Sequence, residues 1–168
     1  MAKSHPATPE QMQKLWEMIK SIQTAMLTSD DDGVLRSRPM VAAQKDFDGV
    51  LWFFTRVGSH KVSEVEHENR VNISYADSQK QNYVSLSGTA LIVTDANVVK
   101  AHWSEAMRTW FPKGSDDPDI AIMRVGVTQA EYWDSPSSAM VYLFGYVKAV
   151  TTGSPPTLGE NEKMSIGQ

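Results

Sequence analysis

The sequence has 168 residues and a mass of 18.7 kDa, which suits one domain with enough chain to bury a core. Its 16 basic and 20 acidic side chains give a net charge of −4, and this balance argues against a broad basic surface for nucleic acid. Because there is no cysteine, disulfides, thiol catalysis and cysteine-ligated metal centres are excluded, so any redox chemistry would depend on a bound cofactor.

The first predicted element is a helix over residues 8–23. Thr8 and Gln11 have the spacing of a capping box, and Pro9 falls in the first turn, where a missing N–H is tolerated. Apolar side chains then recur at steps of three and four residues, at Met12, Leu15, Trp16, Ile19 and Ile22. This stripe predicts a helix that packs one face against the rest of the domain.

The pattern then changes to short runs typical of strands, at residues 25–29, 34–43, 50–55, 71–76, 83–93, 120–133 and 140–150. Turn signals at 31–33 and 46–49 are of the kind that close hairpins. Two shorter helices are expected over 59–67 and 95–107. Strands in hairpin succession with few helices predict a mainly β (α+β) domain built on an antiparallel sheet or small barrel.

The end of the chain differs in composition from the rest. From Thr151 onward, Thr, Gly, Ser and Pro are frequent. We therefore assign residues 1–150 to the domain and residues 151–168 to a C-terminal tail that becomes ordered only when it docks on a partner.

Two further features bear on where the protein works. The N-terminal residues lead into a polar, amphipathic stretch without the apolar core of a signal peptide. The longest apolar run, residues 139–147, has about half the length that a membrane-spanning helix needs. We therefore expect a cytoplasmic protein without a membrane partner.

Candidate chemistry first appears in the strand predicted at 34–43. Arg36 and Arg38 are two residues apart and therefore share a face of the strand. They are either a solvated pair or ligands of an anion. Pro39 removes a ladder donor and marks an edge or a bulge, where backbone groups are free to contact a ligand.

A second candidate lies where the apolar run 50–55 passes through Gly58 into a predicted helix. Ser59 is a suitable N-cap, and the free N–H groups of a helix start favour a phosphate. Lys61 in the first turn opposes the helix dipole, a conflict that a bound anion resolves; the alternative is a lysine that extends into solvent. Together with Arg38, these residues would clamp one phosphate beside a flat apolar wall.

Several motifs, in this order, resemble one known family. They are Arg36-Ser37-Arg38-Pro39-Met40, Phe53-Phe54-Thr55, Gly58-Ser59-His60-Lys61, Tyr83 to Ala90, Trp110-Phe111-Pro112 and Glu131 to Asp134. From about residue 10 to 150 the sequence is similar to the FMN-binding split barrels related to pyridoxamine 5′-phosphate oxidase, and within them to the general stress protein 26 branch. The resemblance implies an antiparallel split β-barrel with an N-terminal helix and two or three short helices. It also implies a homodimer with FMN at the subunit interface; FAD and a deazaflavin are the alternatives.

The resemblance implies roles for individual residues. Arg38, Ser59 and Lys61 would hold the phosphate, and Trp133 would come from the second subunit. His60 replaces the family's arginine and either weakens phosphate binding or lies aside. By position, the flavin-binding set is Arg38, Pro39, Met40, Val41, Phe54, Thr55, Ser59, His60, Lys61, Tyr83, Trp110 and Trp133.

The expected function is that of an FMN-dependent oxidoreductase of a stress response, with a small-molecule redox partner. No side chain stands out as a general base, and Tyr83 is either a proton donor or a structural hydroxyl. The family's Arg-x-His pair is missing after Trp133, so oxidation of pyridoxamine 5′-phosphate is not expected. The alternatives are a protein that sequesters or senses the flavin without turnover, and a barrel without a cofactor.

Two smaller groups complete the candidates. Trp110 and Phe111 precede a proline, and they would either cover the flavin or pack at the dimer interface. The four histidines lack the spacing of a metal site, and no metal is expected.

Overall fold

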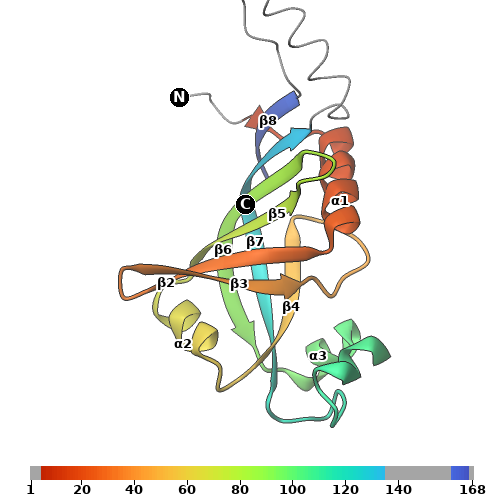
Figure 1. Ribbon diagram of the computed structural model, residues 1–168. Helices are drawn as coiled ribbons and strands as arrows, with labels where there is room; N and C mark the ends of the chain where they lie inside the picture. The colour runs from red at the N-terminus through yellow and green to blue at the C-terminus, as the bar shows by residue number, and fades with distance from the viewer. Residues whose placement is uncertain (1–4, 135–159, 167–168) are drawn as a thin grey trace, which may run out of the picture.

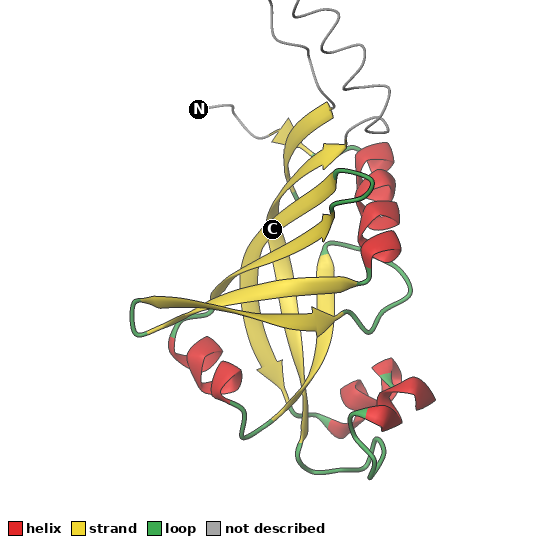
Figure 2. Cartoon of the chain, in the orientation of Figure 1, coloured by secondary structure: helices red, strands yellow, loops and turns green. Residues whose placement is uncertain are grey.

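The computed structural model describes residues 5–134 and 160–166, and this part of the chain is mainly β (Figure 1, Figure 2). Its strands form one sheet in the order β1 (His5–Pro6), β8 (Glu160–Ser165), β7 (Ile120–Asp134), β6 (Asn82–Val93), β5 (Arg70–Asp77), β2 (Thr24–Asp31) and β3 (Val34–Val41), and β4 (Val50–Arg56) pairs with β7 beside this path. The mainly β class with a few helices is therefore confirmed, whereas the split barrel and the homodimer stay predictions. The strand expected at 140–150 lies outside the described residues.

Helix α1, Pro9–Ile22, begins as the sequence predicts. The Thr8 hydroxyl accepts a hydrogen bond from the Gln11 N–H, and the Gln11 side chain accepts one from the Thr8 N–H, so the capping box is formed. The helix lies against β5 and β6 (Figure 1), and Leu15 and Ile19 of its apolar stripe are almost fully buried. The capped start and the buried stripe together fix where the helix lies.

Strands β2, Thr24–Asp31, and β3, Val34–Val41, form the predicted hairpin. Asp32 and Gly33 have φ values of 50° and 87° at its turn, which suits a glycine. Among the described residues β3 lies at the end of the strand order, so Pro39 is there on an edge strand, as expected. The alternative of a bulge at Pro39 is wrong, because the β2–β3 register runs through it without a shift.

Strand β7, Ile120–Asp134, organises the sheet because it has different partners along its length. Its first half pairs with β4, Val50–Arg56, on one edge, and its second half pairs with β8 on the same side. Its other edge pairs with β6, Asn82–Val93, which also pairs with β5, Arg70–Asp77. The β6–β7 ladder shifts register between Ser87 and Gly88, and this is where a bulge occurs.

The sheet curls until β3 approaches β4. Ala42, just after β3, forms an isolated bridge with Phe53, and the Ala43 N–H donates to the Trp52 carbonyl at 2.8 Å. Among the described residues this contact does not extend into a β3–β4 ladder, so the sheet is not closed there. The segment 46–49 therefore connects β3 to β4 without closing a hairpin, in contrast to the prediction.

Helix α2, His60–His67, matches the predicted helix at 59–67, but the helix predicted over 95–107 is interrupted. Helix α3, Ala96–His102, ends where Trp103 and Ser104 adopt extended backbone conformations, and a 3₁₀ turn, η1, follows at Glu105–Thr109. The Trp103 ring meets Phe54 edge-on at 5.8 Å between centroids. The predicted helix is therefore divided at Trp103, the residue whose ring packs on the sheet.

The last described segment corrects the prediction of a tail. Residues of β8, Glu160–Ser165, pair antiparallel with β7 and parallel with the short strand β1, His5–Pro6. Met164 is fully buried and Ile166 nearly so. This segment contributes to the core without a partner protein, while the boundary proposed at residue 150 lies outside the described residues.

Two apolar clusters fill the described part of the chain. The larger lies between the curled sheet and α1, and the smaller joins Phe54, Phe111, Ile120 and Ile122 to Val99 of α3. No helix in the described ranges is long and apolar enough to cross a membrane. The smaller cluster matters for function because it supports one wall of the cavity described next.

Candidate functional site

A cavity of about 500 Å³ opens between the edge of the sheet and the helices α2 and η1. This is the size of a typical small-molecule site. Eight of the twelve predicted site residues line it: Pro39, Met40, Val41, Phe54, Thr55, Ser59, Lys61 and Trp110. They come from the end of β3, the end of β4, the start of α2 and the residue after η1, so the fold joins segments that are far apart in the sequence.

The polar end of the cavity is built where β4 turns into α2. Thr55 is buried, and its hydroxyl lies 3.1 Å from that of Ser59. Ser59 is the N-cap residue, yet its side chain makes no capping hydrogen bond among the described residues. The start of α2 therefore offers two hydroxyl groups and backbone N–H groups, an arrangement that suits an anion.

Lys61 adds a cation to this end. Burial lowers the pKa of its ammonium group, the nearby charge of Arg38 lowers it further, and Glu64 acts in the opposite direction. Lys61 and Arg38 are thus close enough to repel each other. Positive charge at the start of a helix also opposes the helix dipole. An anion bound here would offset both the repulsion between the two cations and their unfavourable interaction with the dipole.

Arg38 itself is held behind the cavity wall and is not one of its lining residues. Its Nη2 donates to the Glu64 carboxylate at 2.5 Å, and its Nη1 donates to the Ser29 hydroxyl. Arg36, which shares its face of β3, pairs instead with Asp31 at 3.0 Å in an exposed ion pair. Each arginine therefore has its own carboxylate, which the sequence alone did not indicate.

The apolar end is formed by rings and methionines. Phe54 lies 6.0 Å from Phe111 between ring centroids, and the Arg56 guanidinium lies 5.1 Å from the centroid of Phe111. Arg56 also donates to the Trp110 carbonyl at 2.9 Å, which ties the segment after η1 to β4. The Trp110 side chain is 68 % exposed at the rim of the cavity.

Sequence reasoning omitted four lining residues from the site: Thr24, Arg56, Met107 and Phe111. Phe111 carried a signal, because two large aromatic residues before a proline were already noted. Arg56 directly follows Thr55, and its charge at the end of an apolar strand was a usable hint. Thr24 and Met107 reach the cavity only through the curl of the sheet and the break between α3 and η1, which have no local sequence signal.

Three predicted residues lie apart from this cavity. His60 is exposed on α2, and Tyr83 and Trp133 pair with each other across β6 and β7. Ala121, the β7 partner of Thr55, marks the cavity end of that strand. From Ala121 to Trp133 the strand continues for about 40 Å at the usual rise per residue. One copy of the chain therefore does not bring Trp133 to the cavity.

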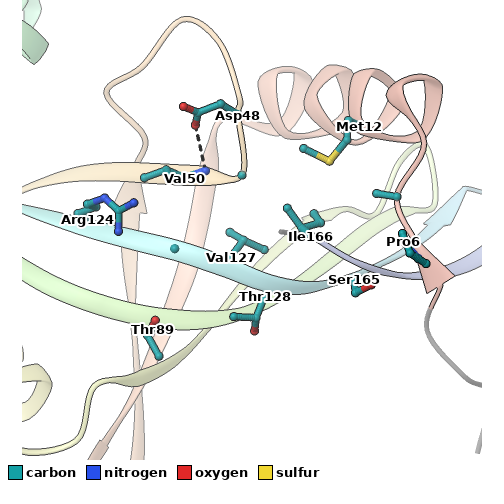
Figure 3. Close-up of a pocket in the computed structure, with 13 residues that line it drawn as sticks. Pro6, Met12, Asp48, Val50, Thr89, Arg124, Val127, Thr128, Ser165 and Ile166 are labelled. Carbon is teal, nitrogen blue, oxygen red and sulfur yellow. Dashed lines mark hydrogen bonds between the residues drawn. The ribbon is translucent and has the colours of Figure 1, made fainter. Parts of the chain in front are cut away.

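A second cavity, of about 490 Å³, lies where β7 changes its partner from β4 to β8 (Figure 3). The cation in its lining, Arg124, lies 5.8 Å from the ring centroid of Trp52. Asp48, a carboxylate in the lining of the same cavity, accepts a hydrogen bond from the Val50 N–H at 3.1 Å. None of the twelve predicted site residues lines it. The described ranges also contain no cluster of His, Asp and Glu suited to a metal ion.

Comparison with known proteins places this geometry in context. The family model described as "Pyridoxamine 5′-phosphate oxidase like" matches residues 10–157. The chain is 29 % identical over 167 residues to Protein bli-3 of Neurospora crassa, covering 93 % of this chain and 80 % of that protein.

Two solved structures are also similar. A general stress FMN/FAD binding protein from Xanthomonas citri is 30 % identical, with a TM-score of 0.68, over 78 % of this chain and 93 % of that one. A chain from Jannaschia sp. CCS1, named after general stress protein 26, has a TM-score of 0.72 over 94 % of this chain and 99 % of that one. The latter is 24 % identical, so it supports the fold alone.

Proposed function

Because the chain belongs to the pyridoxamine 5′-phosphate oxidase-like family, we propose that it binds flavin mononucleotide in the cavity between β3, β4, α2 and η1. This cavity would be one half of a site that two copies of the chain share. The similar protein from Xanthomonas citri is described as binding FMN or FAD, which supports a flavin as the ligand.

The observation that carries the proposal is that one cavity joins a cationic end to an apolar end. Ser59 and Lys61 line it at the start of α2, and Phe54 and Met40 line it from β4 and β3. A phosphate monoester attached to a flat ring system needs both environments. The residues present therefore fit FMN, with the phosphate at α2 and the ring against the strands.

At the phosphate end, Lys61 would contribute a charged hydrogen bond, and Ser59 and Thr55 would contribute hydroxyl groups. Arg38 would act from behind the wall, where its charge already reaches Lys61. Charge-assisted hydrogen bonds of this kind are worth about 1.5–3 kcal/mol each. At the ring end, β3 is an edge strand in the described part of the sheet, so backbone groups of Pro39 to Val41 are available to the heterocycle.

The second half of the site would come from another copy. Tyr83 and Trp133 are distant from the cavity within one chain, and Trp133 is 37 % exposed. A homodimer that placed the partner's Trp133 over the cavity would cover the ring. It would also give the exposed Trp110 a neighbouring surface.

When bound, the flavin supplies hydride or electron transfer, while the protein supplies binding, orientation and electrostatics. The favoured function is an FMN-dependent oxidoreductase that acts with a small-molecule redox partner. The second candidate is a protein that sequesters or senses the flavin. It is favoured by the sequence after Trp133, Asp134-Ser135-Pro136, which offers no cation for an anionic substrate.

The binding proposal is tested by titrating the apoprotein with FMN, FAD and riboflavin and following flavin fluorescence. We expect Lys61→Ala to weaken FMN binding by about ten- to a hundredfold and to leave riboflavin, which lacks the phosphate, unaffected. Lys45→Ala is the matched control, because Lys45 is exposed and outside the cavity lining. Failure of the wild-type protein to bind any flavin, or equal FMN binding by the two variants, would contradict the proposal.

The two candidate functions separate in a second measurement on the flavin-loaded protein. If the flavin absorbance bleaches with NADH or NADPH and returns in air, the oxidoreductase is supported. A bound flavin that stays oxidised with both reductants supports the binding protein instead.

A further inference from the structure

A buried acidic side chain lies directly behind the cationic end of the cavity. Glu64 faces inward from α2 and is 5 % exposed. Its Oε2 accepts hydrogen bonds from the Ser29 hydroxyl and from Arg38 Nη2, both at 2.5 Å. Ser29, on β2, also accepts from Arg38 Nη1. Three residues from three elements thus form one closed polar group beneath the start of α2.

The hydrogen bonding of this carboxylate is incomplete. Both contacts of Glu64 use Oε2, and Oε1 is buried without a hydrogen-bond partner in the described part of the chain. Burial of a charged group without full hydrogen bonding is unfavourable. We therefore infer that the negative charge of the buried Glu64 has a role at this position in addition to packing.

The charges around it indicate what that role is. Arg38 donates to the carboxylate, and its charge lowers the pKa of the Lys61 ammonium, whereas the charge of Glu64 raises it. Without Glu64, two cations would face each other at the start of a helix. In the empty site, the carboxylate supplies the negative charge that a ligand's phosphate would supply in the loaded one.

We propose that Glu64 is an internal stand-in for phosphate, which stabilises the empty site and competes with the phosphate of the ligand for Arg38. The inference rests on the proposed binding of a phosphate-bearing flavin in the adjacent cavity. Competition from Glu64 lowers the affinity for the flavin, and the same carboxylate stabilises the apo form. The flavin is thereby held in an exchangeable way.

The variant Glu64→Gln tests the charge of Glu64 separately from its hydrogen-bonding geometry. The amide oxygen still accepts from Ser29 and Arg38, so both side chains keep their positions, but the competing charge is gone. We expect FMN to bind about tenfold or more tightly, riboflavin to bind as before, and the apoprotein to unfold at a lower temperature. Glu66→Gln is the matched control, because Glu66 is an exposed acid on the same helix; its FMN affinity should stay within about twofold of the wild type.

The outcomes are distinct. Wild-type protein that binds no flavin would remove the proposed function itself. Wild-type protein that binds FMN, together with an unchanged or weaker affinity in Glu64→Gln, would overturn the inference and make Glu64 a positioning residue for Arg38. If Glu64→Gln does not fold, Glu64→Met tests the same prediction with an uncharged side chain of similar length, and tighter FMN binding is again expected.

Discussion

At the scale of single residues, Lys61 shows how this site departs from a relaxed protein surface. It lies in the first turn of α2, where a cation opposes the helix dipole. Burial and the charge of Arg38 lower the pKa of its ammonium group. A bound dianion would counteract the helix dipole and the charge of Arg38, so binding of the ligand and protonation of Lys61 are linked.

This linkage predicts the pH dependence of FMN binding. The charged form of Lys61 is present below its lowered pKa and is lost as the pH rises through it, so affinity should fall at a lower pH than for an ordinary lysine. The measurement is an FMN titration at intervals from about pH 7 to about pH 10. Lys61→Arg, which keeps its charge throughout, should show a smaller decline, and riboflavin controls for ionisation of the ring.

A decline of equal size in the wild type and in Lys61→Arg would assign the pH dependence to other groups. It would then provide no evidence that the charge of Lys61 contributes to binding.

Ser59 and Lys61 carried a local signal, because a helix start favours an anion. Phe54 entered the predicted site through the family resemblance. The Arg38–Glu64 pair spans 26 positions in the chain, and in the sequence Glu64 is one of two acids on α2, the other being Glu66. Its burial depends on how α2 lies over β2, which no local pattern reveals.

At the scale of elements, β7 determines where the site can form. It holds β4 and β8 in succession on one edge, and the bulge at Ser87 and Gly88 adjusts its pairing with β6. Gly88 is required there by packing: a Cβ at this position would lie 2.3 Å from the Gly126 carbonyl oxygen. The backbones of β6 and β7 approach each other too closely for any side chain.

We therefore expect Gly88→Ala to lower the free energy of unfolding by about 2 kcal/mol or more, because backbone atoms must move to admit the methyl group. Gly58→Ala is the control, since a Cβ there meets nothing within 4 Å. It should change stability by less than about 0.5 kcal/mol. Chemical denaturation followed by tryptophan fluorescence measures both, and equal stability of the two variants would contradict the packing argument.

Sequence periodicity predicted most elements but missed two features with non-local causes. The capped start of α1 and the β2–β3 hairpin follow from Thr8, Gln11 and the Asp32-Gly33 turn, which are local signals. The helix expected at 95–107 is interrupted at Trp103, whose ring contacts Phe54 of β4, a residue far away in the chain. The strand β8 lies in a segment rich in turn-forming residues, and its partner edge on β7 becomes visible only in the folded sheet.

At the scale of the whole molecule, the proposed site extends beyond one chain. The cavity lies at the first half of β7, whereas Tyr83 and Trp133 lie at its far end. In one copy these two regions are separated by most of the length of the sheet. A two-fold dimer in which the far end of each copy lay at the cavity of the other would form two equal sites.

Mixed dimers of two variants test this arrangement. Lys61→Ala damages the cavity half of a site, and Trp133→Ala damages the half that the second copy would supply, so each variant alone should bind FMN weakly. If the halves come from different chains, a mixed dimer contains one site with both halves intact and one with both damaged. Co-expression with two affinity tags isolates that dimer, and we expect about half of the wild-type FMN sites with wild-type affinity. If both halves belong to the same chain, every site in the mixed dimer carries one defect, and no site of wild-type affinity would be recovered.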